Sequence, residues 1–98
     1  MGRKARYDYY PPGEIIKAAL EKRKITQREL AEIINTSAPT VNDIITGKRG
    51  ITDNLCVRLS LALGLDPFEL ARAYSDYAIK MELKRFMAHI SKDANDEN

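Results

Sequence analysis

Residues 26–50 decide the fold, and they read TQRELAEIINTSAPTVNDIITGKRG. The stretch opens with a capping box, because the Thr26 hydroxyl can accept from the backbone N–H of Glu29 while the Glu29 carboxylate reaches back to the N–H of Thr26. This pattern predicts a helix that begins after Thr26. We expect it to end at Asn35, because asparagine tolerates the left-handed backbone that closes a helix.

A second short helix follows at once. Ser37 is a good N-cap, so we expect a helix over about 38–46 that Gly47 ends. Two short helices around so tight a turn form the helix-turn-helix arrangement. The apolar residues that would fix the angle between them are Leu30, Ala31, Ile34, Val41, Ile44 and Ile45.

Working outward, the rest of the chain also indicates helices. One helix is expected from Glu14 to about Arg23, one after Thr52 as far as Gly64, and one from Asp66-Pro67 to about Lys92. No segment alternates like a strand. The sequence therefore predicts an all-α, five-helix domain with an extended C-terminal helix.

Composition and charge divide the chain into four parts. We expect a basic and aromatic arm over 1–12, a helix-turn-helix domain over 13–66, a long C-terminal helix over 67–92 and an acidic, disordered tail over 93–98. The net charge is only +2. The arm carries a net +2 and residues 92–98 carry a net −2, so the charge is unevenly spread. The arm could bind nucleic acid, pack on the domain or become ordered only with a partner.

Four stretches, in order and at the expected spacings, resemble the phage-repressor (XRE) type of DNA-binding domain, and within it the HigA antitoxins of toxin–antitoxin pairs. They are Pro12-Gly13-Glu14-Ile15-Ile16, Thr26 to Ala31 (TQRELA), Ser37 to Ile44 (SAPTVNDI) and Gly47 to Thr52 (GKRGIT). The resemblance covers residues 13–65. It implies a lambda-repressor-like fold and a sequence-specific repressor of transcription that autoregulates its operon. Its partners would be operator DNA and a toxin. Gln27 would contact a phosphate or brace the helix expected over 38–46.

If the second helix enters the major groove, its outward residues face base edges. Asn42 can then pair with adenine through two hydrogen bonds, and Asp43 could accept from cytosine or repel phosphates and so enforce register. Because this helix has no outward Lys or Arg, attraction to phosphates must come from its flanks. The expected base-reading residues are Ala38, Pro39, Thr40, Asn42, Asp43 and Thr46, and the expected phosphate contacts are Gln27, Arg28, Ser37, Lys48 and Arg49.

The last helix carries two apolar stripes. The first, with Leu70, Tyr74, Tyr77 and Met81, can pack on the domain. The second lies beyond the domain and needs another surface, so we expect a homodimer. We call this second set the α-helical stripe, and it consists of Ile79, Leu83, Phe86, Met87 and Ile90.

Several function classes are disfavoured by the sequence. It has one cysteine, Cys56, and one histidine, His89, so we expect no disulfide, metal site or cofactor. No acid–base pair or nucleophile motif indicates an enzyme. No apolar run approaches the ~20 residues that span a bilayer, and we expect a cytoplasmic protein. Two alternatives stay open: a stand-alone repressor without a toxin, and a protein-interaction module that does not bind DNA.

Overall fold

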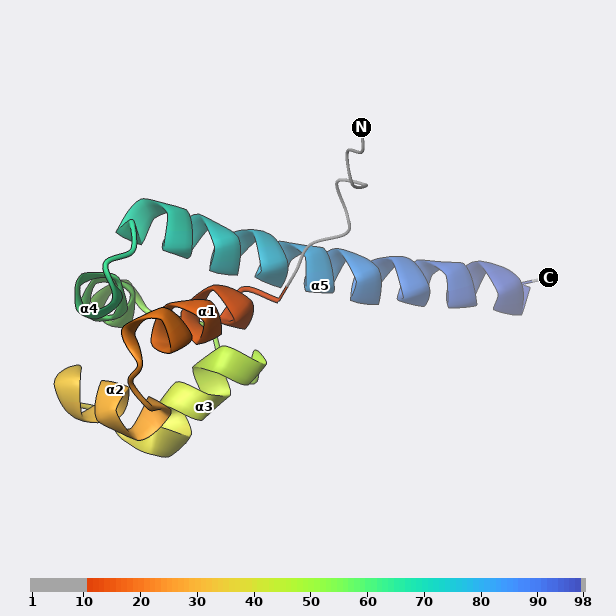
Figure 1. Cartoon of the computed structure of the whole chain (residues 1–98). Coiled ribbons are helices and arrows are strands. Elements are labelled where there is room, and N and C mark those ends of the chain that lie inside the picture. The colour runs from red at the N-terminus through yellow and green to blue at the C-terminus, as the bar shows by residue number, and fades with distance from the viewer. Residues whose placement is uncertain (1–10, 98) are drawn as a thin grey trace.

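The computed structural model describes residues 11–97, with side chains as far as Ile90. In this range the chain forms five helices: α1 (Gly13–Arg23), α2 (Gln27–Ile33), α3 (Ala38–Thr46), α4 (Asp53–Leu63) and α5 (Pro67–Glu97). Figure 1 shows α2 and α3 on one side of α1, α5 on the other side, and the second half of α5 extending past the domain as a rod. The predicted all-α, five-helix fold is confirmed.

The helix ends follow the predicted caps. The Thr26 hydroxyl accepts from the N–H of Glu29 at 3.0 Å, and the N–H of Thr26 donates to the Glu29 carboxylate at 2.8 Å. The hydroxyls of Ser37 and Thr52 cap α3 and α4. Left-handed residues end α3 and α4, with φ of 86° at Gly47 and 71° at Gly64. The capping residues chosen from the sequence therefore set the helix boundaries.

A single hydrophobic core joins the five helices. All six residues expected between α2 and α3 are buried in it, together with Ile16, Leu59, Leu63 and Leu70. Tyr74 is also buried, so the packed unit continues into α5 and does not stop at residue 66. Leu55 and Ala62 of α4 are partly buried against this core.

The sequence prediction for the end of α5 was wrong. The helix was expected to end near Lys92 and to be followed by a disordered tail over 93–98, but it continues to Glu97. Residues 93–97 contain neither Gly nor Pro, and alanine, aspartate and glutamate are tolerated near a helix end, so nothing in this segment stops the backbone. Residues 1–10 of the arm expected over 1–12 lie outside the described residues.

Candidate nucleic-acid interface

The turn between α2 and α3 is closed by backbone hydrogen bonds. The N–H of Thr36 donates to the carbonyl of Ala31 at 2.8 Å, and the N–H of Asn35 donates to the carbonyl of Glu32 at 3.2 Å. Asn35 has a φ of 60°, the left-handed conformation that its side chain was expected to tolerate. The two helices therefore form a short, internally bonded unit in which α2 packs on α3.

The C-terminal half of α3 is held from behind by two other helices. A Cβ placed on Gly13 would lie 1.8 Å from the carbonyl oxygen of Ile45, so the start of α1 touches the backbone of α3 with no room for a side chain. The Tyr74 hydroxyl of α5 donates to the carbonyl of Ile44 at 3.0 Å. These contacts fix how far α3 projects from the domain.

The Tyr74 phenol keeps its proton, and so remains a hydrogen-bond donor, at neutral and moderately alkaline pH. Burial, with a smaller contribution from the neighbouring Cys56, raises the pKa of Tyr74 well above its ordinary value. The neutral form is therefore favoured in the folded protein, and it keeps the proton that the Ile44 carbonyl accepts.

The opposite face of α3 is open to solvent. Pro39, Asn42 and Thr46 are exposed and Asp43 is partly exposed. Counted from Pro39, the other three lie three, four and seven residues further along the helix, so the four residues share one face. Ala38 differs from the expectation, because it is partly buried against the core and offers only part of its surface.

The hydroxyl groups at the start of α3 bond to each other. Ser37 accepts from the N–H of Thr40 at 3.2 Å and donates to the Thr40 hydroxyl oxygen at 2.9 Å. The Ser37 hydroxyl is thus engaged in capping, which leaves its backbone and remaining lone pair for any further contact. The hydroxyl proton of Thr40 stays available as a donor.

The loop after α3 is tied to the helix by one carbonyl. The oxygen of Asp43 accepts from the N–H of Lys48 at 2.9 Å and from the N–H of Arg49 at 3.3 Å. The Thr46 hydroxyl donates to the same oxygen at 3.4 Å. The backbone of Lys48 and Arg49 is fixed beside the end of α3, while both side chains are exposed.

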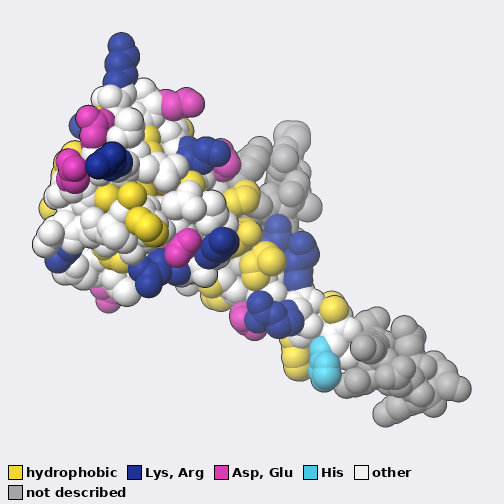
Figure 2. Space-filling view, turned by 90° about the horizontal axis from the view of Figure 1, so that it is seen from below, with side chains coloured by type: hydrophobic (Ala, Val, Ile, Leu, Met, Phe, Trp, Pro, Cys, Tyr) yellow, Lys and Arg dark blue, Asp and Glu magenta, His cyan; other side chains and the backbone are white. Residues whose placement is uncertain are grey.

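At the start of α2 the two candidate residues differ in exposure. Gln27 is partly buried and Arg28 is exposed. Both lie in the first turn of α2, where backbone N–H groups and the helix dipole favour an anion. Figure 2 views the molecule from below and shows dark blue and magenta side chains interspersed over this face, without a large field of one sign.

The α-helical stripe of α5 lies apart from this surface. Ile79 and Leu83 are exposed by 57% and 47%, and Phe86, Met87 and Ile90 are exposed by 49% or more. Ile79 follows Leu70 by nine residues, and Leu83 follows Tyr74 by nine, which is about two and a half turns. The stripe therefore lies on the side of α5 opposite the one that packs on the domain.

Sequence reasoning missed the residues that hold α3 and α2 in place. Gly13 was named only within a stretch that resembles the XRE type, and Tyr74 only as part of an apolar stripe. The Arg58 guanidinium donates to the carbonyl of Ile34 at 2.8 Å and so satisfies the end of α2. For Tyr74 a signal existed, since a buried tyrosine hydroxyl usually needs a partner. The partner itself is thirty residues away and could not be inferred.

Other expectations concern residues away from α3. Cys56 is buried and its thiol donates to the carbonyl of Pro67 at 3.2 Å, as a core thiol. Among the described residues, no three His, Cys, Asp or Glu side chains gather as metal ligands. None of the helices described combines the length and the apolar character needed to cross a membrane.

The fold and the exposed second helix define a class: helix-turn-helix proteins of the five-helix, lambda-repressor-like type. The sequence pattern of the helix-turn-helix family matches residues 16–70. This is more than half of the chain, and the chain therefore belongs to the helix-turn-helix family.

Two solved structures and one further protein are similar to this chain. A candidate antidote protein of a plasmid maintenance system from Nostoc punctiforme has a similar structure, with a TM-score of 0.80, 27% identity and coverage of 88% of this chain and 94% of that one. The Pseudomonas aeruginosa antitoxin HigA, solved with the higBA promoter, has a TM-score of 0.72, 30% identity and coverage of 81% and 87%.

The third relative is the Escherichia coli (strain K12) protein named as the uncharacterized HTH-type transcriptional regulator YddM. It is 30% identical over 56 residues, which cover 57% of this chain. The match spans 60% of the length of that curated relative.

Proposed function

We propose that the protein binds operator DNA sequence-specifically through the exposed face of α3 and regulates transcription, as a HigA-like antitoxin that autoregulates its operon. The observation that carries this proposal is the placement of α3. Its inner side is fixed by Gly13 and Tyr74, and its outer side presents amide and hydroxyl groups that no other helix covers. The names of the HigA and YddM relatives support the same function.

Base reading falls to the outer side of α3. The Asn42 amide offers one donor and one acceptor, the pair that adenine requires in the major groove. The free hydroxyl proton of Thr40 can donate to a base acceptor, and the Thr46 methyl can contact a thymine methyl. Pro39, Asp43 and the exposed part of Ala38 complete the surface that meets the bases.

Phosphate contacts fall to the flanks. Lys48 and Arg49 extend from a loop whose backbone is fixed at the end of α3, so their charges are held near the groove edge. Arg28, Gln27 and the backbone at Ser37 are placed at helix starts, where a phosphate oxygen is favoured. These groups fix register and orientation and do not read sequence.

Two alanine variants test this division of roles. Asn42→Ala should weaken operator binding by roughly 1–3 kcal/mol and leave the affinity for random DNA unchanged, because it removes a base contact. Arg49→Ala should weaken both about equally and lower the slope of affinity against salt by ~1, because it removes a phosphate contact.

Arg72→Ala removes the same charge from α5, a helix that contacts the inner side of α3 and not its exposed face, and should change neither affinity (Figure 1). Titrations would use the DNA upstream of the protein's own gene and a random duplex, at several salt concentrations. Wild-type protein that shows no salt-dependent binding to either duplex would favour a protein-interaction module.

We propose that the protein is a homodimer joined through the α-helical stripe of α5. Five large apolar side chains in this stripe are exposed, and a second copy can cover them without touching α3. Replacing both Leu83 and Phe86 by glutamate should give a monomer in light scattering at micromolar concentration. Lys84→Glu adds a carboxylate to another side of the same helix and should leave the dimer intact. A wild-type monomer at that concentration would refute the proposal.

We further propose a toxin as a protein partner, a cytoplasmic location with the operator, and no enzymatic activity. The support is the similarity to antitoxins. Co-purification with the product of a small neighbouring gene would test the toxin partner. A stand-alone repressor would bind its operator with the same affinity in the presence and absence of that product.

A further inference from the structure

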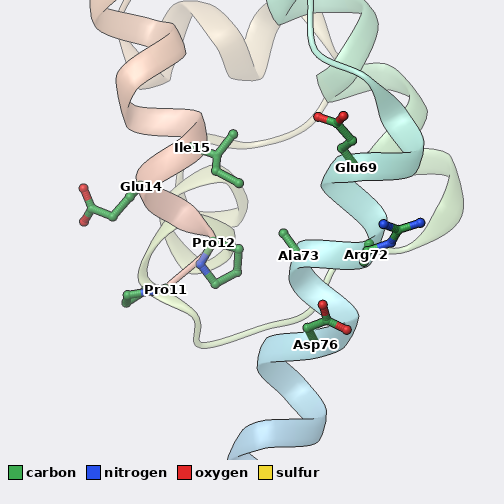
Figure 3. A pocket seen from close by; sticks show the side chains of 8 residues that line it. All are labelled: Pro11, Pro12, Glu14, Ile15, Glu69, Arg72, Ala73 and Asp76. Atoms are coloured by element: carbon green, nitrogen blue, oxygen red, sulfur yellow. The ribbon is translucent and has the colours of Figure 1, made fainter. Parts of the chain in front are cut away.

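A groove of about 560 Å³ separates the start of α1 from the first half of α5. Figure 3 shows Pro12, Ile15 and Ala73 facing the gap, with Glu69 reaching into it from α5 and Asp76 further along that helix. Glu14 and Arg72 are turned to the outer sides of their helices. The groove thus has an apolar floor and a rim whose inward-facing charges are acidic.

The acidic rim is not neutralised by the domain itself. The structure records no ion pair for Glu69 or Asp76 among the residues it describes, and both side chains are exposed. Together the four charged residues that line the groove carry a net charge of −2. A segment that binds here should be basic and should carry apolar or aromatic side chains for the floor.

The chain itself supplies such a segment at the groove. Pro11 lines the groove, and its carbonyl accepts from the N–H of Glu14 at 3.1 Å, so the point where the arm begins is fixed there. Residues 3–10 read RKARYDYY, with three basic residues, one aspartate and three tyrosines. Their charge is the opposite of that of the groove.

Length and tethering favour the arm of the same chain over other occupants. The groove wall on α5 from Glu69 to Asp76 is about 10 Å long, whereas eight extended residues reach about 26 Å. A segment attached directly at the groove has an effective concentration in the millimolar range, far above that of a free partner.

We infer that the groove between α1 and α5 binds the chain's own basic, tyrosine-rich segment 3–10. The tyrosine rings cover the apolar floor formed by Pro12, Ile15 and Ala73. The basic side chains approach Glu69 and Asp76. No residue of the groove belongs to the exposed face of α3 or to the α-helical stripe of α5.

Paramagnetic relaxation in the full-length protein, without DNA, tests the docking. A nitroxide attached at Ala5→Cys should abolish the amide signals of Glu69 to Asp76 and leave those of α4 visible. Cys56 is only 4% exposed, so the wild-type chain treated with the same label serves as the blank. Signals in the groove that survive unchanged would overturn the proposal.

Charge variants make the test specific. The double variant Glu69→Lys, Asp76→Lys should restore the groove signals, and so should high salt, because the attraction is partly electrostatic. The matched control is the double variant Glu21→Lys, Glu32→Lys, on exposed positions of α1 and α2. In this control the nitroxide should still abolish the amide signals of the groove. Groove signals that stay lost in the first double variant would contradict the charge argument.

A mixed sample separates the same chain from a second copy. Spin-labelled protein without ¹⁵N is mixed with ¹⁵N-labelled wild-type protein. Docking within one chain predicts no loss of the ¹⁵N signals. Loss of the groove signals in this mixture would show that the arm of a second copy is the occupant and would overturn the proposal.

Discussion

Between Pro67 and Tyr77, α5 packs on the domain and buries Leu70 and Tyr74, whereas between Met81 and Ile90 every side chain of the same helix is exposed. The first part is stabilised by the core and in turn fixes α3. The second part contributes no side chain to the core that the described residues form, and its helix is supported by backbone propensity and by side-chain pairs such as Glu82 with Arg85. One continuous helix therefore joins a folded domain to an exposed apolar stripe.

The largest loss of stability is expected from a substitution that forces α1 away from α3. Gly13→Ala should lower the free energy of unfolding by about 3 kcal/mol, because the new Cβ meets the backbone of Ile45, which cannot move aside like a side chain. Gly50→Ala is the matched control, since a Cβ there has open space and Gly50 does not need a positive φ. Urea unfolding of both variants gives the comparison, and equal stabilities would contradict the contact.

Removing the Tyr74 hydroxyl should have a smaller effect. Tyr74→Phe should cost about 1 kcal/mol, the typical net value of a hydrogen bond, because Gly47 also donates to the Ile44 carbonyl and keeps it satisfied.

The same variant tests a pH dependence. The pKa of Tyr74 is raised in the folded state, so the unfolded chain loses this proton first. The stabilisation is complete below about pH 10, the ordinary tyrosine value, and is lost as the pH rises above it. Tyr74→Phe should therefore lose less stability than the wild type between neutral and alkaline pH. Parallel losses in both proteins would contradict burial of the phenol.

Ending the chain after Tyr77 tests whether the exposed half of α5 contributes to the stability of the domain. The domain should unfold with a free energy within about 0.5 kcal/mol of that of the Leu83→Glu, Phe86→Glu monomer, because residues beyond Tyr77 bury nothing in the core. Denaturant titration at low protein concentration measures this difference. A much less stable truncated domain would show that the exposed half supports the fold.

The smallest effect is expected within the exposed half itself. Glu82→Gln removes the ion pair with Arg85, but both side chains are about 70% exposed, and such pairs contribute at most about 0.5 kcal/mol. Glu14→Gln, which removes the exposed pair with Lys17 on α1, should give a similarly small change. Circular dichroism should show no loss of helix in either variant.

The sequence alone was sufficient to predict structure where a residue interacts with its near neighbours in the chain. Thr26, Ser37, Thr52 and Gly47 act within four residues, so their capping roles were predicted correctly. The end of α5 was predicted wrongly because a charged segment can stay helical when no residue breaks it. The exposed face of α3 followed from its period of 3.6 residues, apart from Ala38.

Contacts between distant residues could not be predicted. Arg58 binds the carbonyl at the end of α2, and Arg23 donates to the Leu63 carbonyl at 2.9 Å, although both were apparent only as surface charges. Whether an arginine meets solvent or a helix end depends on the packing of two helices. The roles of Asn42 and Arg49 on DNA, and of the stripe in a dimer, stay predictions.

The contact between Gly13 and Ile45 joins the wall of the groove to α3. Pro11 and Pro12 line the groove, Gly13 follows them directly, and Ile45 belongs to the helix that we propose reads DNA. A ligand in the groove that moved these prolines would press Gly13 against the Ile45 carbonyl, because no side chain lies between the two backbones to absorb the shift. If that movement changed the affinity of α3 for DNA, then DNA bound at α3 would change the affinity of the groove for its ligand by the same factor.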